Sequence, residues 1–279
     1  MDYQYIRVLG EGAFSRVYLA EDGVGTRFAC KVSRETKMLK REAEILSCLY
    51  HPLFPAYIDY QEREGMGRLV MEYIPGKSLG QMMRARGRLS PRQAMGMAKE
   101  LTEGLGYLHE RGAGILYRDL KPENIMVCED GHIKLIDFGC ASYRDAQDGA
   151  KVGTPGFAPP EQLEEGGIPG FYSDVYSLGK TLQSVMNMGG KCRFKRKKYV
   201  GDWGRGSVRR KPGREERQCR RRLERLVGEA AHTDPRRRPQ DMAEVALILT
   251  GKRKKEHGVI CEKNIWESNY KNSCSLPSI

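Results

Sequence analysis

The segment ILYRDLKPENIMV, residues 115–127, places three polar residues between two short apolar runs. The polar residues are Asp119, Lys121 and Asn124, and the apolar runs are 115–116 and 125–127. A solvated loop does not need apolar flanks, so we expect both runs to be short buried strands that fix the loop between them. The pattern raises the question of what would hold an acid, a base and an amide together at the mouth of a core.

The chain has 279 residues, enough for one large domain or for two modest lobes that share a cleft. Its hydrophobic content of 39% supports a core. The longest apolar candidate for a membrane span, residues 245–249, is far shorter than the roughly 20 residues that a span needs. The first ten residues do not resemble a signal peptide. We therefore expect no membrane anchor within this sequence.

The eight cysteines form no C-x-x-C pair and show no regular spacing. This favours reduced thiols in a cytoplasmic protein over a disulfide framework. A zinc site would need closer clustering of Cys and His.

The net charge of +12 is concentrated in one segment, because residues 191–222 hold fifteen Lys or Arg and three acids. One interpretation of this basic segment is a flexible solvated loop. The other is a docking site for an anionic partner, namely an acidic protein, nucleic acid or a membrane surface. Tyr199 and Trp203 lie among the basic residues, as nucleic-acid binding would require.

Apolar runs at residues 5–9, 17–20, 27–32 and 68–73 are separated by turn-like residues and predict strands. Leucine and alanine at helical spacing predict a helix over residues 37–49.

Later segments are predicted to be helical. Ser90 to Gln93 reads as a helix start, with a Ser cap, Pro at the first position and Gln in a capping box. Further helices are expected over residues 173–188, 220–231 and 241–249, followed by a weakly ordered tail over 251–279. Strands first and helices later indicate a two-lobed α+β protein.

Gly10 and Gly12 follow the first strand and would let the backbone present N–H groups to phosphates. This pattern is weak by itself, and a dinucleotide-binding fold is excluded because a strand, not a helix, is expected next. Lys31 lies in an apolar strand and would need a buried acid. Glu42 is the candidate, since Glu44 lies on another face of the predicted helix.

Asp137 follows the apolar run 133–136 and precedes Phe and Gly. Together with Asn124 it could hold Mg²⁺, which prefers a few hard oxygens and phosphate oxygens. Asp119 would then be free to accept a hydroxyl proton, and Lys121 could reach a transferred phosphoryl group.

These motifs stand in the order and spacing of the eukaryotic-like (Hanks-type) serine/threonine protein kinases, and the chain resembles that family over about residues 5–250. The resemblance continues in GTPGFAPPEQ, SDVYSLG and DPRRRP. It implies that Glu161 pairs with Arg238 and that Asp174 braces the catalytic loop.

The resemblance implies a bilobal α+β fold with a small, mainly antiparallel β N-lobe over residues 1–74, which contains one key helix. A larger, mainly helical C-lobe would cover residues 75–250 and include the basic insertion-like segment 189–222. The tail 251–279 would follow. Pro75-Gly76 would act as the hinge.

ATP and Mg²⁺ are the cofactors that the resemblance implies, and it assigns a role to each motif residue. Lys31 and Glu42 would hold the phosphates, Asp119 and Lys121 would act on the substrate hydroxyl and the phosphoryl group, and Asn124 and Asp137 would bind metal. The residues implied to bind nucleotide are Gly10, Gly12, Val17, Ala29, Lys31, Met71, Glu72, Ile74 and Met126. Lys121, two residues after Asp119, and the GTPGFAPPE segment favour Ser/Thr over Tyr as the acceptor in protein substrates, and autophosphorylation is expected too.

The sequence departs from the family pattern at three positions. Ser15 replaces the third glycine of the phosphate loop, Tyr117 stands where His is usual, and Pro159 replaces Ala. We expect Tyr117 to pack beneath Phe138 as the usual residue does.

Arg118 directly precedes Asp119. In the family, an arginine just before this aspartate often pairs with a phosphate on the activation loop. Few hydroxyls are available here, so Asp145 and Asp148 are hypothesised to supply the negative charge, which would make the enzyme active without phosphorylation.

Two other functions are compatible with the fold. A pseudokinase, acting as a nucleotide-binding scaffold through its basic segment, would usually lack Lys31, Asp119 or Asp137, and all three are present. A small-molecule kinase is disfavoured by the complete GTPGFAPPE segment. Cys140 is interpreted as a small buried filler rather than a reactive thiol.

Overall fold

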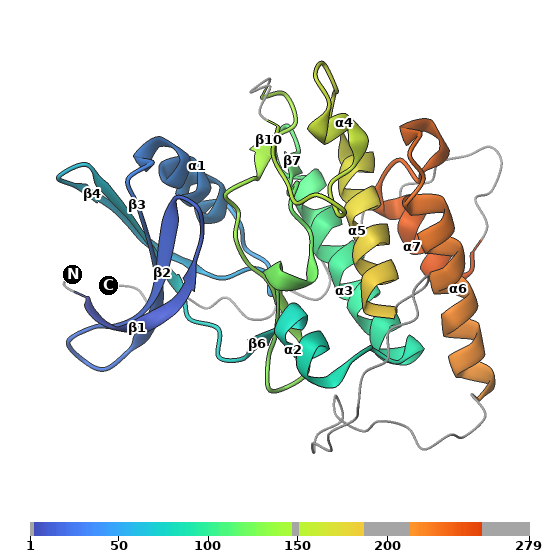
Figure 1. The fold of residues 1–279 in the computed structure, drawn as a ribbon, viewed down its shortest axis with the longest axis horizontal. Coiled ribbons are helices and arrows are strands. Elements are labelled where there is room, and N and C mark those ends of the chain that lie inside the picture. The colour runs from blue at the N-terminus through green and yellow to red at the C-terminus, as the bar shows by residue number, and fades with distance from the viewer. Residues whose placement is uncertain (1–2, 147–150, 187–212, 253–279) are drawn as a thin grey trace, which may run out of the picture.

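The computed structural model describes residues 3–146, 151–186 and 213–252. The chain forms two lobes (Figure 1). The small lobe is a five-stranded antiparallel sheet with strand order β1-β2-β3-β5-β4, and helix α1 packs against β4 and β5. The elements of this lobe are β1 (Gln4–Glu11), β2 (Ser15–Glu21), β3 (Arg27–Ser33), α1 (Thr36–Ser47), β4 (Tyr57–Arg63) and β5 (Met66–Glu72).

In the large lobe, helix α3 packs against α5, α6 and α7 (Figure 1). Short strands and 3₁₀ turns lie in the segments between helices. Its helices are α2 (Leu79–Arg86), α3 (Pro91–His109), α4 (Pro160–Leu163), α5 (Phe171–Met186), α6 (Arg214–Ala230) and α7 (Met242–Thr250). Its strands are β6 (Lys77–Ser78), β7 (Ile115–Leu116), β8 (Ile125–Val127), β9 (Ile133–Leu135) and β10 (Ser142–Tyr143), and 3₁₀ turns cover Pro122–Asn124 and Pro235–Arg237. The bilobal α+β prediction is confirmed.

Helix α3 begins as the sequence predicts. The hydroxyl of Ser90 accepts from the backbone N–H of Gln93 at 3.3 Å, and the Gln93 side chain accepts from the Ser90 N–H at 3.0 Å. Pro91 occupies the first turn. A stripe at helical spacing is buried: Ala94, Met97, Leu101, Leu105 and Leu108. This stripe makes α3 the central helix of the large lobe.

The apolar runs on either side of the polar loop are short strands, as predicted. β7 pairs antiparallel with β10, and β8 pairs with β6 and β9. All residues of β7 are buried, as are Ile125 and Val127 of β8. The polar loop between them is therefore fixed at both ends.

Helix α6 corrects one expectation, because it begins at Arg214 rather than at residue 220. Its first residues belong to the basic segment, for which one interpretation was a flexible solvated loop. Arg and Glu are good helix formers, and Arg220 and Arg225 each pair with a glutamate one turn later, Glu224 and Glu229. Residues 191–212 of the segment lie outside the described residues.

Several elements were not predicted, among them β4 and α2. The edge strand β4 carries few buried side chains, so its apolar periodicity is weak. Helix α2 is only eight residues long and is started by Ser78, whose hydroxyl accepts from the Gln81 N–H at 3.2 Å. Within the described residues no helix is long and apolar enough to cross a membrane. The predicted tail, 251–279, falls outside them after residue 252.

Candidate active site

Strand β3 and helix α1 bring together a buried lysine and a buried glutamate. The Nζ atom of Lys31 lies 2.7 Å from Oε2 and 2.9 Å from Oε1 of Glu42. Both side chains are buried, while Glu44 is exposed. Of the two candidate acids, Glu42 is thus the one that pairs with the ammonium group. Its Oε1 also accepts from the Phe138 N–H at 3.2 Å, which links α1 to the large lobe.

Asp137 completes an ion triad with this pair. Its backbone is left-handed, with φ 67°, and its Oδ1 lies 2.7 Å from Lys31 Nζ. Desolvation by itself would raise the pKa of the Asp137 carboxyl, but the Lys31 ammonium outweighs it and holds the pKa below its usual value. Burial alone would lower the pKa of the Lys31 ammonium group. The carboxylates of Glu42 and Asp137 raise that pKa by a larger amount, so it lies above its usual value. Both pKa shifts keep Lys31 and Asp137 charged at neutral pH.

The polar loop forms a closed network around Asp119. Its Oδ2 accepts from Lys121 Nζ at 2.7 Å and its Oδ1 from Thr154 Oγ1 at 2.7 Å, while Lys121 also donates to Thr154 at 2.7 Å. Asn124 donates to Asp119 Oδ2 at 3.0 Å and to its main-chain oxygen at 2.9 Å. Because the amide nitrogen of Asn124 faces Asp119, its amide oxygen is turned away and can face a cation.

Asp174 of α5 holds the backbone of this loop. Its fully buried carboxylate accepts from the N–H of Tyr117 and of Arg118, both at 2.9 Å. It lies 3.0 Å from His109 Nε2, and the His109 ring stacks on Phe171. Arg118 has φ 70°, a conformation that costs free energy in a non-glycine residue. The two backbone bonds to Asp174 compensate for that cost.

Tyr117 packs against Phe138, as predicted. Both rings are buried, with centroids 5.4 Å apart in an edge-on arrangement. The Tyr117 hydroxyl donates to the carbonyl oxygen of Ile136, next to Asp137. Burial raises the pKa of Tyr117 well above its usual value, so the hydroxyl keeps the proton that it donates.

Arg118 contacts a neutral side chain. Its Nη1 donates to Ser142 Oγ at 3.0 Å, and both side chains are buried. Asp145 is exposed, and Asp148 lies outside the described residues. The hypothesis that these acids supply the charge for Arg118 therefore stays a prediction.

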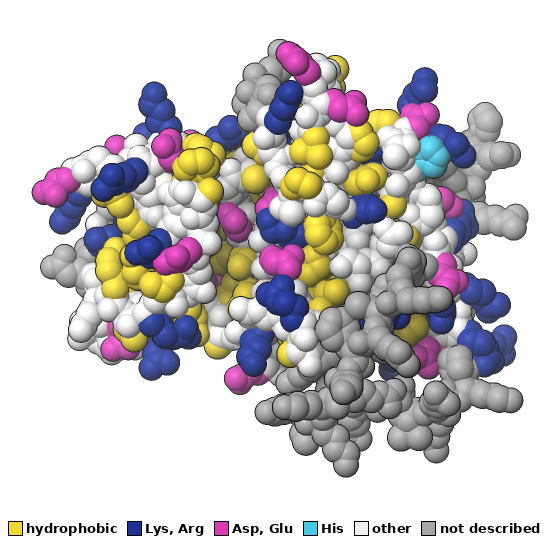
Figure 2. Space-filling view, viewed as in Figure 1, with side chains coloured by type: hydrophobic (Ala, Val, Ile, Leu, Met, Phe, Trp, Pro, Cys, Tyr) yellow, Lys and Arg dark blue, Asp and Glu magenta, His cyan; other side chains and the backbone are white. Residues whose placement is uncertain are grey.

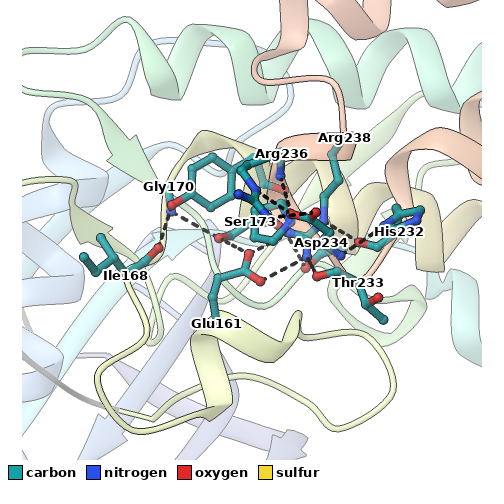
Figure 3. Close-up of polar contacts among 12 residues, drawn as sticks. Glu161, Ile168, Gly170, Ser173, His232, Thr233, Asp234, Arg236 and Arg238 are labelled. Carbon is teal, nitrogen blue, oxygen red and sulfur yellow. Dashed lines mark hydrogen bonds and ion pairs between the residues drawn. The ribbon is translucent and has the colours of Figure 1, made fainter.

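Glu161 and the buried Arg238 form the ion pair that the resemblance implied (Figure 3). Nη1 and Nη2 of Arg238 lie 2.6 Å and 3.0 Å from the two carboxylate oxygens, and Ser173 Oγ donates to Oε1 at 2.8 Å. Arg238 also donates to the carbonyl oxygens of His232 and Thr233. The pair anchors α4 to the segment before α7.

Three of the residues implied to bind nucleotide, Val17, Ala29 and Met71, lie on one face of the sheet. Val17 pairs with Lys31, and Ala29 pairs with Met71, so these side chains share the face that carries the lysine. Met126 is half-buried on β8 of the large lobe, and Ile74 is buried.

Glu72 turns its side chain away from this face. Its Oε2 accepts from Lys134 Nζ at 2.7 Å and from the Ala56 N–H at 3.0 Å.

One detail of the glycine loop differs from expectation. The N–H of Gly12 donates to the carbonyl oxygen of Ser15 at 2.8 Å, because that bond closes the β1–β2 turn. It is thus used within the protein rather than presented to a ligand. A Cβ atom at Gly10 would meet no heavy atom within 4 Å, so a ligand can approach the backbone there.

The residues fit a nucleotide with magnesium. Asp137 has 48% of its side-chain surface accessible, and its carboxylate and the amide oxygen of Asn124 are the hard ligands that Mg²⁺ prefers. The ammonium of Lys31 is charged and held in place by Glu42. These groups would suit phosphate oxygens together with a divalent metal ion.

Cys140 is partly buried, and its surroundings disfavour the thiolate form. Burial, with a contribution from Asp119 and Asp137, raises the pKa of the Cys140 thiol to about 11. The thiolate is therefore scarce at neutral pH, which supports the interpretation of this residue as a filler.

Among the buried polar residues near the loop that were not singled out from the sequence are His109 and Gln162. His109 lies in the last turn of an apolar helix, where a core histidine is the ordinary interpretation. Gln162 follows Glu161 within a quoted motif, but only its contacts distinguish it from a surface amide.

Comparison with known proteins places the chain in a family. The protein kinase domain model matches residues 3–246, and the chain belongs to the protein kinase family. It is 37% identical over 188 residues to the serine/threonine-protein kinase RUNKEL of Arabidopsis thaliana, covering 64% of this chain and 14% of that protein. It is 33% identical over 197 residues to the serine/threonine-protein kinase PrkC of Bacillus subtilis, covering 66% of this chain and 30% of that protein.

A third relative is the probable cAMP-dependent protein kinase catalytic subunit of Encephalitozoon cuniculi, 34% identical over 197 residues, which cover 66% of this chain and 60% of that protein. The chain thus matches less than two thirds of the length of each of these relatives. The resemblance to Hanks-type serine/threonine kinases is confirmed.

Proposed function

We propose that the protein transfers the γ-phosphate of Mg-ATP to Ser or Thr hydroxyls of proteins, including its own. One observation carries the proposal: the ion triad of Lys31, Glu42 and Asp137 and the network around Asp119 are both complete in one chain. The names of the similar proteins support a Ser/Thr acceptor.

Each group has a role that follows from its chemistry. Bound Mg-ATP supplies the transferable phosphoryl group. Lys31 would hold phosphate oxygens, and Asp137 and Asn124 would bind the metal. Asp119 would orient the acceptor hydroxyl and take its proton, while Lys121 stabilises negative charge beside it. Binding and positioning provide most of the rate enhancement in such a site.

Labelled phosphate transfer tests this function. We expect wild-type protein with Mg-ATP to label itself and a generic basic protein, with label on phosphoserine or phosphothreonine after hydrolysis. Asp119→Ala and Lys31→Met should each lower transfer by at least about a hundredfold, because each removes a group with no substitute nearby. Removal of Mg²⁺ with a chelator should abolish transfer. The exposed Lys37→Met on α1 is the matched control.

Nucleotide binding without transfer under any metal or salt condition would instead support a pseudokinase. In that case the basic segment would be the better candidate for the seat of function. As a separate proposal, residues 191–222 bind an anionic partner, on the ground of their charge. The described cysteines carry free thiols, which supports a reducing compartment such as the cytoplasm.

A further inference from the structure

A buried glutamine amide lies between the two segments that carry the Asp119 network. Gln162 is on α4, directly after Glu161, and its side chain is 2% exposed. Its Nε2 lies 2.6 Å from the carbonyl oxygen of Arg118 and 2.6 Å from that of Val152. A primary amide has two N–H donors, so each carbonyl receives one.

The two carbonyls flank the reactive network in the chain. Arg118 directly precedes Asp119, and Val152 is two residues before Thr154. The Thr154 hydroxyl donates to Asp119 at 2.7 Å. One neutral side chain therefore sets the distance between two backbone segments that are far apart in sequence.

Packing around this amide is tight. Gly153 has φ 111°, which side chains disfavour, and a Cβ atom there would lie 2.4 Å from Gln162 Nε2 and 3.1 Å from the Arg118 carbonyl oxygen. Within the described residues, Oε1 of Gln162 is buried without a hydrogen-bond partner. That buried oxygen costs free energy, so the contribution of this side chain comes from its nitrogen.

We propose that Gln162 is a positioning residue for phosphoryl transfer, whose amide holds the Thr154 segment against the catalytic loop and so fixes the Asp119 carboxylate. This inference rests on the proposed kinase function. Lys31 and Glu42 lie on β3 and α1 of the small lobe, away from α4 (Figure 1). The effect of Gln162 therefore falls on kcat, while KM for ATP is set elsewhere.

The isosteric variant Gln162→Glu gives the sharpest test. Its carboxylate would face two carbonyl oxygens and could donate to neither, so kcat at pH 8 should fall about tenfold to a hundredfold with KM for ATP unchanged. As the pH falls to 6, the buried carboxyl takes up a proton and donates to one carbonyl. The ratio of variant to wild-type kcat should then rise severalfold. Gln162→Leu, which has no titratable group, should show a ratio that does not change with pH.

The matched control is Gln93→Glu, which makes the same chemical change in the capping box of α3, where Glu serves as well as Gln. Its kcat should equal that of wild type. A pH-independent ratio for Gln162→Glu, or a change in KM for ATP instead of kcat, overturns the proposal. Since Gln162→Glu is compared with itself at two pH values, it carries the test even where Gln162→Leu fails to fold.

Amide hydrogen exchange gives a readout that does not depend on activity. The N–H groups of Phe157 and Ala158 both donate to the Thr154 carbonyl oxygen. Their exchange in Gln162→Glu at pH 8 should be at least about tenfold faster than in wild type. Unchanged exchange would show that Gln162 does not hold the Thr154 segment, and it overturns the proposal. A wild-type protein that transfers no phosphate, together with faster exchange in the variant, overturns the kinase function but not the contact by which Gln162 holds that segment.

Discussion

Single charged residues are fixed in this protein by partners on other elements. Lys31 contacts Glu42 on α1 and Asp137 after β9, and Asp174 accepts from two backbone N–H groups of the polar loop. A buried charge is stable only when it is paired or hydrogen-bonded. The stability of the fold therefore depends on the protonation state of the ion triad.

The ion triad predicts a pH-dependent stability. The lowered pKa of Asp137 means that its ionisation stabilises the fold above the unfolded pKa near 3.8, and that this contribution is lost as the pH falls through the folded pKa. Lys31→Met removes the cation, and both carboxyls then bind protons more readily. We expect Lys31→Met to lower the free energy of unfolding by about 3 kcal/mol at pH 7 and by clearly less at pH 4.5.

Urea denaturation of both proteins at the two pH values measures this difference. Lys40→Met, an exposed change on the same helix as Glu42, is the control and should be neutral within about 0.5 kcal/mol. A difference between wild type and Lys31→Met that is the same at both pH values would show that the triad does not carry the effect.

At the scale of elements, the short strands matter as much as the long helices. The segment after Asp137 is tied back by the β10–β7 pairing and by the contact between Ser142 and Arg118. Its later part is tied by Thr154 and by α4. Apart from Glu161 of α4, which pairs with Arg238, the groups that the segment contributes to these contacts are neutral side chains or backbone atoms.

Neutral ties predict activity without phosphorylation of this segment. Phosphatase-treated wild type should keep its activity, whereas Ser142→Ala should lower it about tenfold, because the buried Arg118 guanidinium loses an acceptor. Tyr143→Phe, an exposed change on the same strand, is the control. The measurement is labelled phosphate transfer before and after phosphatase treatment. If treatment abolishes wild-type activity, a phosphate is required and this prediction is wrong.

Across the whole molecule, the site depends on both lobes at once. Lys31 and Glu42 come from the small lobe, and Asp119, Asn124 and Asp137 from the large one (Figure 1). Several contacts besides the triad join the lobes, among them the ion pair of Glu72 with Lys134 and the bond from the Leu135 N–H to the Leu53 carbonyl oxygen at 2.7 Å. Relative movement of the lobes would therefore change the site directly.

Charge is also a property of the whole molecule. Basic and acidic side chains are interspersed over the described part of the face drawn in Figure 2, while residues 191–222 hold the net charge of +12. Binding to a polyanion should therefore depend on that segment. It should weaken steeply as the salt concentration rises, because binding releases counterions and this release is less favourable at high salt.

Retention on immobilised heparin over a salt gradient tests this dependence. Replacing residues 195–198 with Gln should make the protein elute at clearly lower salt. The double variant Lys37→Gln/Lys40→Gln, on exposed positions of α1, should have a smaller effect. Equal elution of all three proteins would exclude the basic segment as a polyanion site.

The sequence by itself determined the class of fold, the change from a strand-rich part to a helical part, and the residues of the motifs at the candidate site. These features are local: a Ser cap and Pro at the start of α3, apolar periods of two and of 3.6, and polar residues between short apolar runs. Local propensity also explains the errors, because the charged start of α6 and the edge strand β4 have weak apolar patterns.

Only the tertiary structure decided which groups meet. It paired Lys31 with both Glu42 and Asp137, placed the neutral Ser142 beside Arg118, and used the Gly12 N–H within its own turn. It also placed the Gln162 amide between two carbonyls. Such contacts join residues up to a hundred positions apart, and their geometry depends on how whole elements pack. No periodicity or spacing along the chain encodes that geometry.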